Sequence, residues 1–538
     1  MGGPAAVTTS DSRGYADLVD RSKPWWKNAR LVKLNLCILL LLITSTTNGY
    51  DGSMMNGLQS LPQWNAAFNY PSGGKLGLLS AIQNIGCLAA YPFSPYMSDG
   101  LGRRVAVIFG ATIMCIATVI QTASHSVGMF IGARFLIGFG LTFAAAAAPV
   151  LVTEIAYPSH RAPATSLYNT LWFLGSIIAA WTTFGTFNVP TSWAWRIPSA
   201  IQALPSVIQV FLIWFIPESP RWLCSKGREE EALRILAYYH ANGDRTDPLV
   251  EYEFEEIRAA IQFDKEIAAN VGWSSLVKTP GNRRRLRIMI AIAFFSQWSG
   301  NNLIAYYMNK IFTAIGITDP NTQLLINGIL NIYNFIIAII AGLLCDKIGR
   351  RPLFIASTIG MFVFWVLQTA CFAVYSETGN IAAAHTFIAM IFLFYAFFRS
   401  LTIFSQMMFI AFTPLIVSYT VEILPFALRA KGFTVFNFSL TLSLIFNQYI
   451  NPIALNALGW KYYIVYVCWL AFEIGFIWCF LIETKNRTLE ETAALFDGKD
   501  NADMLAQHAA VNTGVTISDQ HSDREKAPSE DIIEEVKS

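Results

Sequence analysis

Long apolar stretches alternate with short polar segments along most of the chain. A helix that spans the hydrocarbon core of a bilayer needs about 20 mostly apolar residues. Twelve stretches meet that requirement, at residues 34–55, 76–97, 105–123, 128–152, 164–187, 196–216, 288–314, 322–344, 353–375, 386–420, 432–452 and 460–482. The pattern therefore predicts an all-α membrane protein with twelve transmembrane helices.

The polar segments divide the chain into five regions. A polar N-terminal segment, 1–33, precedes the first six stretches, 34–216, and a charge-rich linker, 217–287, separates these from the last six, 288–482. The linker contains amphipathic segments, which predict short helices outside the membrane. The tail, 483–538, has a composition typical of disorder. The N-terminal segment lacks a short apolar run with a cleavage site, so no removable signal peptide is expected.

Basic residues are unevenly distributed among the connections, and this predicts the orientation of the chain. Clusters of Lys and Arg lie in the N-terminal segment and after the even-numbered stretches, whereas the opposite connections hold few. Cytoplasmic loops of membrane proteins are enriched in these residues. We therefore expect both termini in the cytoplasm.

The composition supports a membrane protein and argues against a soluble enzyme, a disordered protein and a nucleic-acid-binding protein. Of the 538 residues, 54% are hydrophobic and 14% are charged, against about 25% charged in a typical soluble domain. The net charge is +2, which gives no indication of a nucleic-acid partner. The eight cysteines include no CxxC pair, so neither a metal site nor a disulfide framework is expected.

Three pairs of motifs recur in the same order in the two sets of six stretches. DGLGRR follows the second stretch and DKIGRR the eighth; a glutamate seven residues before an arginine follows the fourth and the tenth; PESPR follows the sixth and IETKNR the twelfth. Parallel halves of this kind are typical of transporters that bind substrate between the repeats. We expect the charged residues of these motifs to form a cytoplasmic gate: Asp99, Arg103, Arg104, Glu154, Arg161, Glu218 and Arg221 in the first half, and Asp346, Arg350, Arg351, Glu422, Arg429 and Glu483 in the second.

These motifs, together with QWSGNN and two tyrosines in the seventh stretch, resemble the sugar porter family of the major facilitator superfamily over residues 30 to 498. Within that family, NGYDGSMMNG, SLYNTLWFLGSIIAAW and GREEEALRILAYYHANGDRTDPL are similar to fungal lactose permeases. The resemblance implies the major facilitator fold, a place in the plasma membrane, and transport rather than enzymatic activity. The chain departs from the family pattern at two places. IETKNR lacks the proline and the glycine of the family motif, and Ser296 stands where the family often has a glutamine.

Asp51 and Arg134 are the clearest charged residues within the apolar stretches. A charge at the centre of a spanning helix costs about 2.5–3.5 kcal/mol, so such residues are candidates for function. At about 1.5 Å per residue, Asp51 lies about 27 Å from the inner end of its helix and Arg134 about 9 Å from the outer end of its own. Their depths match, and protonation of a paired aspartate would release the arginine. The pair either couples transport to protons, as the resemblance implies, or ties the first helix to the fourth.

Amide side chains are expected to form the sugar site. Counted from the inner ends of their helices, Asn169, Gln297 and Asn334 lie about 12, 15 and 18 Å deep, and Asn302 follows Gln297 by five residues. A carboxamide can donate and accept at once, which suits neighbouring sugar hydroxyls. The resemblance assigns these four positions to sugar contact, and Asn447 and Tyr306 are further candidates. The alternative is hydrogen bonding or packing between helices.

The tenth apolar stretch is unusually long. Residues 386–420 contain only one charge, Arg399, and as a single helix they would extend about 52 Å. Against the family pattern, Arg399 to Phe409 reads as an insertion of 11 residues. It is either an extra loop or re-entrant turn, or an untranslated piece retained in the gene model.

We therefore expect a secondary transporter that imports a small sugar, a disaccharide such as lactose or a hexose, with a proton as the coupling ion and with no cofactor or metal. Its expected partners are the sugar and the lipid bilayer, with no nucleic acid, and it is expected to act as a monomer. The alternatives are an uncoupled facilitative carrier and a non-transporting sugar sensor. A sensor should carry a long cytoplasmic extension with signalling repeats, which the tail does not show.

Overall fold

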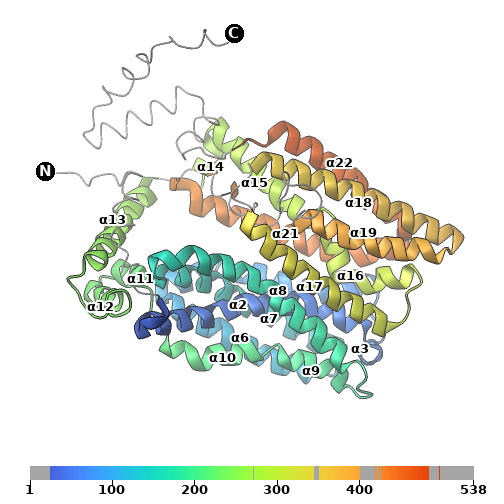
Figure 1. Ribbon diagram of the computed structural model, residues 1–538, viewed down its shortest axis with the longest axis horizontal. Coiled ribbons are helices and arrows are strands. Elements are labelled where there is room, and N and C mark those ends of the chain that lie inside the picture. The colour runs from blue at the N-terminus through green and yellow to red at the C-terminus, as the bar shows by residue number, and fades with distance from the viewer. Residues whose placement is uncertain are drawn as a thin grey trace, which may run out of the picture.

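The described part of the chain is helical and forms one elongated bundle (Figure 1). The computed structural model describes residues 25–270, 272–344, 350–399, 419, 420, 423, 424, 426–483 and 496. The earlier part of the bundle consists of η2 (Trp25–Lys27), α2 (Ala29–Ser60), α3 (Pro62–Ala67), α4 (Gly73–Ala90), α5 (Ser94–Leu101), α6 (Arg103–Thr122), α7 (Val127–Ile155), η3 (Pro158–His160), α8 (Arg161–Thr186), α9 (Trp193–Ile201), α10 (Leu204–Leu212) and η4 (Ile213–Phe215).

A second group of helices, coloured from yellow-green to red, lies beside the first (Figure 1). Its members are α14 (Ser275–Lys278), α15 (Pro280–Trp298), α16 (Asn301–Ala314), α17 (Pro320–Leu344), α18 (Arg350–Thr378), α19 (Ile381–Arg399), α21 (Phe426–Leu458), η6 (Gly459–Lys461) and α22 (Tyr462–Phe480). The groups meet where α4 packs against α21, α8 against α17, and α2 against α16. At the first of these crossings the backbones are close, because a Cβ on Gly77 would lie 2.5 Å from the Tyr449 carbonyl oxygen.

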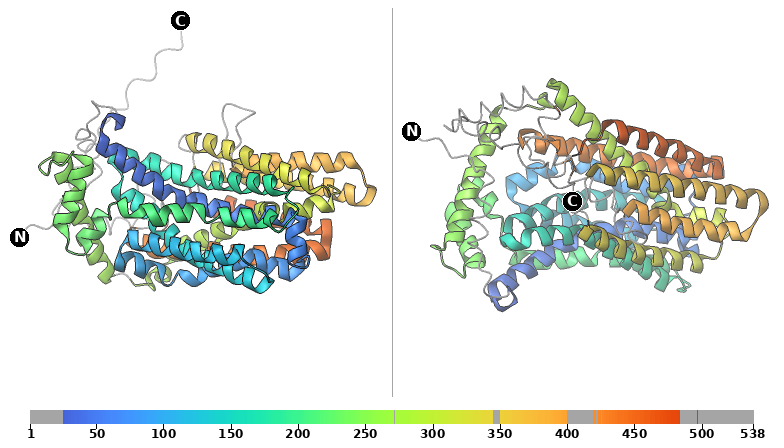
Figure 2. Two further views of the ribbon diagram at one scale, coloured as in Figure 1. Left: turned by 90° about the horizontal axis from the view of Figure 1, so that it is seen from below. Right: turned by 45° about the horizontal axis from the view of Figure 1, so that its top comes forward.

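The linker forms a small helical cluster of its own at one end of the bundle (Figures 1 and 2). It contains α11 (Pro220–Ser225), α12 (Glu229–His240) and α13 (Pro248–Asn270). Leu223 and Ala232 are buried between these helices, and Leu236 packs with Val250. The expected amphipathic helices are thus present, and their apolar faces are turned toward one another.

Six helical segments of the described chain are long and apolar enough to cross a membrane, and a seventh is present if the bent pair α4 and α5 counts as one span. The six are Ala29–Ser60, Arg103–Thr122, Val127–Ile155, Trp193–Phe215, Phe354–Thr378 and Lys431–Phe480. Large apolar side chains such as Phe211, Trp214 and Trp478 are more than 60% exposed on the outside of the bundle. Contiguous outward apolar surface of this kind fits contact with lipid.

Three stretches that the sequence predicts as continuous helices are interrupted. The helical path of 76–97 bends by 48° between α4 and α5, where Pro92 and Pro95 remove backbone donors. The stretch 196–216 breaks between α9 and α10, and 288–314 breaks at Ser299 and Gly300 between α15 and α16. Gly300 has φ of +93°, a conformation that glycine adopts without steric cost. Hydrophobicity alone gives no sign of these breaks, whereas a Pro or Gly lies at each of them, with Pro205 at the start of α10.

Of the unusually long tenth stretch, the structure describes α19, which ends at Arg399. The rest of the segment Arg399 to Phe409 lies outside the described residues.

Candidate functional site

Asp51 and Arg134, which the sequence places at matching depths, lie together in the interior of the bundle. Asp51 on α2 is 0% exposed and Arg134 on α7 is 2% exposed. Arg134 Nη1 lies 3.9 Å from Asp51 Oδ1, so the direct ion pair is long. Gln83 on α4 bridges it: its Nε2 donates to Asp51 Oδ2, and its Oε1 accepts from Arg134 Nη2 at 2.6 Å.

Two further amides extend this buried network. Gln202, between α9 and α10, donates to Asp51 Oδ1 and accepts from Gln121 Nε2 of α6 at 3.1 Å. The Asp51 carboxylate is thus held by two neutral donors and one distant cation. Sequence reasoning did not identify Gln83, Gln121 or Gln202, although each is a polar residue within an apolar stretch.

Tyr306 connects this network to the second group of helices. Its ring hydroxyl, on α16, is in electrostatic contact with Asp51 and Arg134 and hydrogen-bonds with the Gln448 side chain on α21. Its backbone carbonyl accepts from Gln59 Nε2 of α2 at 3.0 Å. Tyr306, predicted as part of the sugar site, therefore lies beside the charged pair.

Three of the predicted sugar-binding amides lie together where α15, α16 and α21 meet. Asn302 Nδ2 donates to the side-chain oxygen of Gln297 at 2.8 Å and to its carbonyl oxygen at 3.1 Å. Asn447 Nδ2 donates to the same carbonyl oxygen at 2.6 Å. Asn447 Oδ1 in turn accepts from Asn451 Nδ2, and Asn451 Oδ1 accepts from the hydroxyls of Tyr462 and Tyr466. The break between α15 and α16 lets Gln297 and Asn302, five residues apart, face each other.

Asn334 and Asn169 lie on two helices that pack together, α17 and α8. Asn334 is 4% exposed, and its Oδ1 has no hydrogen-bond partner among the described residues. An unsatisfied buried acceptor is costly, so this oxygen is suited to receive a hydroxyl group. The side chain of Asn169 lies outside what the structure describes.

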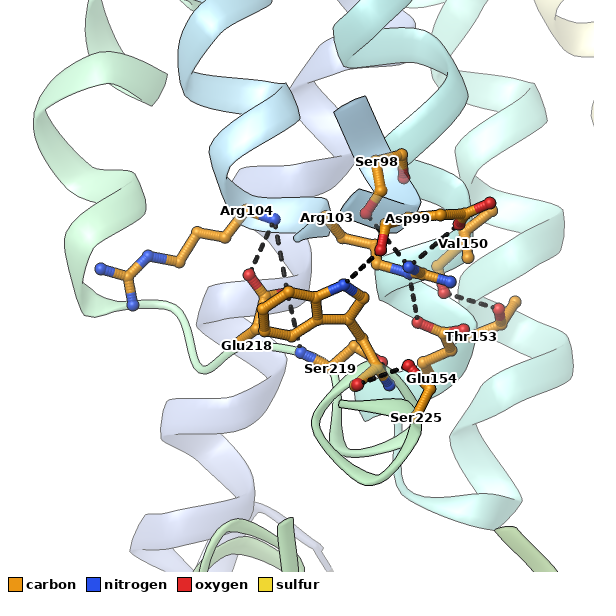
Figure 3. A network of polar contacts seen from close by, with 11 residues as sticks. Ser98, Asp99, Arg103, Arg104, Val150, Thr153, Glu154, Glu218, Ser219 and Ser225 are labelled. Carbon is orange, nitrogen blue, oxygen red and sulfur yellow. Dashed lines mark hydrogen bonds and ion pairs between the residues drawn. The ribbon is translucent and has the colours of Figure 1, made fainter. Parts of the chain in front are cut away.

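Five of the seven gating residues predicted after the second, fourth and sixth stretches lie close together near the linker (Figure 3), namely Asp99, Arg103, Arg104, Glu154 and Glu218. Arg103 contacts Glu154 at 3.2 Å and Asp99 at 3.1 Å. Glu218 accepts the backbone N–H of Arg104, with its oxygens 3.3 and 3.4 Å from the nitrogen. Burial raises the pKa of Glu218, against the effect of these hydrogen bonds. Arg221 lies in α11.

The corresponding contact recurs in the second half. Glu483 accepts the backbone N–H of Arg351 at 3.0 Å, and the Arg351 side chain donates to the Trp478 carbonyl at 2.9 Å. In the first half, the Arg104 side chain likewise donates to the Ile216 carbonyl at 3.2 Å. The side chains of Arg350 and Arg429 are not described, and Asp346 and Glu422 lie outside the described residues.

Arg161 joins the linker helices to the bundle. It does not pair with Glu154, seven residues earlier, but donates to Glu253 of α13 at 2.8 Å. Glu253 is 1% exposed and its other oxygen binds His240 Nδ1. His240 Nε2 faces the Ile155 carbonyl at 3.3 Å. Both ring nitrogens of His240 therefore lie next to oxygen atoms, one of the Glu253 carboxylate and one of the α7 backbone.

Comparison with known proteins gives one consistent result. The sequence profile described as Sugar (and other) transporter matches residues 37–496. The high-affinity glucose transporter of Kluyveromyces lactis is 29% identical over 468 residues, which cover 82% of this chain and 81% of that protein. A quinate permease of Neurospora africana is 31% identical over 348 residues, which cover 62% of this chain and 65% of that protein.

A likeness to a solved structure concerns the fold. The inward-open structure of the xylose transporter XylE from E. coli superposes with a TM-score of 0.69 at 22% identity, covering 86% of this chain and 100% of that chain. The described part of this chain therefore has the all-helical fold of that transporter.

Proposed function

The chain belongs to the sugar transporter family of the major facilitator superfamily and is a multi-pass membrane transporter, not an enzyme; on that premise we propose that it imports a sugar together with a proton by alternating access. The sugar is a disaccharide such as lactose, or a hexose. The protein works as a monomer in the plasma membrane, with both termini in the cytoplasm and twelve spanning helices in two halves of six.

The repeated contact at the two DxxGRR motifs supports two equivalent halves. In each half, a glutamate that follows the last predicted span accepts the backbone N–H of the motif's second arginine. In each half, that arginine also binds a carbonyl near the end of the same span. Two segments that far apart in sequence build the same local structure, as internal duplication would produce.

The amide cluster supports a sugar as the substrate. Gln297, Asn302 and Asn447 present donors and acceptors without charge, and Asn334 offers an unsatisfied oxygen. Sites for neutral small molecules combine an apolar lining with a few such polar groups. The named relatives are a glucose transporter and a quinate permease, so small polyhydroxylated substrates fit the family.

The observation that carries the proton coupling is the buried Asp51 carboxylate bridged to Arg134 through Gln83. When Asp51 is ionised, the Gln83 amide can donate to it while accepting from Arg134. When Asp51 is protonated, its charge no longer attracts Arg134, and the link between α2 and α7 weakens. A proton taken up from the outer side would thus free the helices to move.

The energy available from this proton is adequate for accumulation. One charge that crosses 100 mV releases about 2.3 kcal/mol, and each pH unit adds about 1.4 kcal/mol. Since about 1.4 kcal/mol corresponds to a tenfold concentration ratio, the two together sustain more than tenfold accumulation.

Uptake in a yeast strain without its own sugar transporters tests the proposal. Radiolabelled lactose and glucose are supplied with and without a protonophore, to cells that express the wild type, Asp51→Asn, or the loop variant Asp319→Asn as a control. We expect the wild type and the control to accumulate sugar until the protonophore is added. Asp51→Asn should exchange sugar across the membrane without accumulating it. If Asp51→Asn accumulates sugar with the pH dependence of the wild type, the coupling role is wrong, and accumulation by none of them would favour an uncoupled carrier.

A further inference from the structure

A second acidic group is buried in the bundle, away from Asp51. Glu473 lies in the middle of α22 and is 0% exposed. Among the described residues, no basic side chain forms an ion pair or an electrostatic contact with it. An isolated carboxylate in such surroundings is very costly, and a carboxylic acid usually remains neutral there. The carboxyl group therefore needs a role that it can fill without charge.

The contacts of Glu473 fit the neutral acid. Ser299 Oγ lies 3.1 and 3.0 Å from the two carboxyl oxygens, and the same hydroxyl also donates to the Phe295 carbonyl. A hydroxyl has one hydrogen, so Ser299 Oγ cannot donate a full hydrogen bond to both the Phe295 carbonyl and an ionised Glu473 carboxylate. If Glu473 carries the proton, it donates to Ser299 Oγ, Ser299 donates to Phe295, and both bonds are made.

Ser299 occupies the turn between α15 and α16. The next residue, Gly300, has φ of +93°, and a Cβ there would collide with the Trp365 ring of α18. Trp365 is fixed in turn by its Nε1, which donates to the Tyr463 carbonyl of α22 at 3.1 Å. The turn is therefore enclosed by α18 and α22, and Glu473 makes its polar contact with it.

The turn separates two amides of the proposed sugar site. Gln297 is two residues before Ser299, and Asn302 is three residues after it. The helix is interrupted between them at Ser299 and Gly300, and their side chains meet across this break in a hydrogen bond at 2.8 Å. A group that fixes this turn thus fixes the distance between the two amides.

We propose that Glu473 is a positioning residue of the sugar site, which in its protonated form donates a hydrogen bond to Ser299 and thereby fixes the turn that brings Gln297 and Asn302 together. The inference rests on the proposed function for the identity of the ligand, and on the geometry alone for the turn. Glu473 does not contact the sugar.

Besides Ser299, the Trp469 side chain on α22 hydrogen-bonds with the Glu473 carboxyl group, and the carbonyl oxygen of the neutral acid can accept this bond. The basic residues described on the neighbouring helices are not in contact with Glu473. On α15, the basic residues Arg283 to Arg287 precede Ser299 by at least 12 residues, about 18 Å along the helix. On α18, the Arg351 side chain donates to the Trp478 carbonyl of α22, five residues after Glu473 and about 7.5 Å along the helix, and it has no electrostatic contact with Glu473. On α21, Lys431 lies 16 residues before Asn447, about 24 Å away along the helix. On α22 itself, the Tyr466 hydroxyl is bonded to Asn451.

The first test needs no sugar. Purified full-length protein is compared with Glu473→Gln by infrared spectroscopy at pH 7, with Cys468→Ser on the same helix as the control. We expect a carbonyl band of a protonated carboxylic acid in the wild type and the control that is absent from Glu473→Gln. Hydrogen exchange of the peptide that contains residues 299–302 should be unchanged in Glu473→Gln, whose amide can still donate, and at least tenfold faster in Glu473→Ala.

Sugar binding then tests the positioning role. Binding of radiolabelled lactose and glucose should stay within about twofold of the wild type in Glu473→Gln and weaken at least tenfold in Glu473→Ala and in Ser299→Ala. The double variant Ser299→Ala, Glu473→Ala should bind no worse than either single variant, because both remove one interaction. A carboxylate band at position 473, or equal exchange at 299–302 in all variants, would overturn the inference. Failure of Asp51→Asn to abolish accumulation would overturn only the coupling proposal.

Discussion

At the scale of single residues, neutral amide side chains form the hydrogen bonds that hold the buried charged pair. Asp51 is held by Gln83 and Gln202, and its cation Arg134 remains 3.9 Å away. A tight ion pair would strongly stabilise the ionised form of Asp51. Neutral amide donors leave a smaller free-energy difference between its ionised and protonated forms. This arrangement suits a group that must gain and lose a proton in each transport cycle.

The amide at Asn302 gives a direct test of the sugar site. Asn302→Ala removes a side chain that bonds Gln297 and that we propose contacts a sugar hydroxyl. Loss of one such bond costs about 1–2 kcal/mol, so the KM for the transported sugar should rise about 5- to 30-fold. The control is Thr313→Ala on the same helix, whose hydroxyl donates to the Asn309 carbonyl of that helix. An equal rise in KM for both variants would count against a sugar contact at Asn302.

The sequence predicted some of these residues and missed others for a physical reason. Asp51 and Arg134 stood out because charges are rare in spanning helices, and their matched depths predicted the proximity that the structure shows. Gln83 and Gln202 did not stand out, because a lone amide in an apolar run is common. Glu473 lies in such a run as well, and only the fold shows that it meets Ser299.

At the scale of elements, the polarity pattern predicted where helices exist better than where they break. The linker helices α12 and α13 appear where charge-rich amphipathic segments predicted them. Their attachment through Glu253, Arg161 and His240 could not be predicted, since these partners lie on α13, α8 and α12. The turn at Ser299 and Gly300 was also missed, because the apolar pattern continues through it.

The contact between α6 and the PESPR segment has a predictable pH dependence. Burial raises the pKa of Glu218 in the folded protein above its ordinary value of 4.5. As pH rises, the unfolded chain therefore releases this proton first, and the stability that the neutral acid contributes at low pH is lost as pH passes through the raised pKa. Glu218→Gln cannot titrate and escapes this loss.

Thermal unfolding of the purified protein from pH 4 to pH 8 measures this effect. The Tm of the wild type relative to that of Glu218→Gln should fall as pH rises. Glu230→Gln, a surface variant on α12, should follow the wild type at every pH. A relative Tm that rises with pH would show instead that the hydrogen bonds from Arg104 and Ser219 make the carboxylate the favoured form.

At the scale of the whole molecule, the two groups of helices are joined by polar contacts at one end. Asn309 donates to Ser60, Gln59 donates to the Tyr306 carbonyl, and Asn84 donates to Gln448. The first two contacts involve Ser60 and Gln59, the last residues of α2, which gives way to α3 at the end of the bundle away from α11–α13 (Figure 1). We propose that this end faces the outside, so the contacts close the outer side of the pathway. Alternating access then requires that they separate and form again in each cycle.

The crossing of α4 and α21 tests this requirement through two glycines three residues apart. A Cβ on Gly77 would lie 2.5 Å from the backbone oxygen of Tyr449, whereas a Cβ on Gly74 would meet side-chain atoms alone, the Tyr449 hydroxyl at 3.5 Å and Ile453 Cδ1 at 3.8 Å. A backbone atom cannot turn aside as a side chain can. Gly77→Val should therefore keep the two groups apart at the outer end, while Gly74→Ala should let them close.

We expect Gly77→Val to lower sugar uptake at least tenfold and Gly74→Ala to stay within about twofold of the wild type. Asn309→Cys, introduced into each background, reports on the outer end through its reaction with a membrane-impermeant maleimide. The cysteine should react faster in Gly77→Val than in Gly74→Ala, because its partner Ser60 has moved away. Lost uptake with unchanged labelling would mean that Gly77→Val damages the fold and does not hold the outer side open, and closure at this crossing would then not be the step that transport requires.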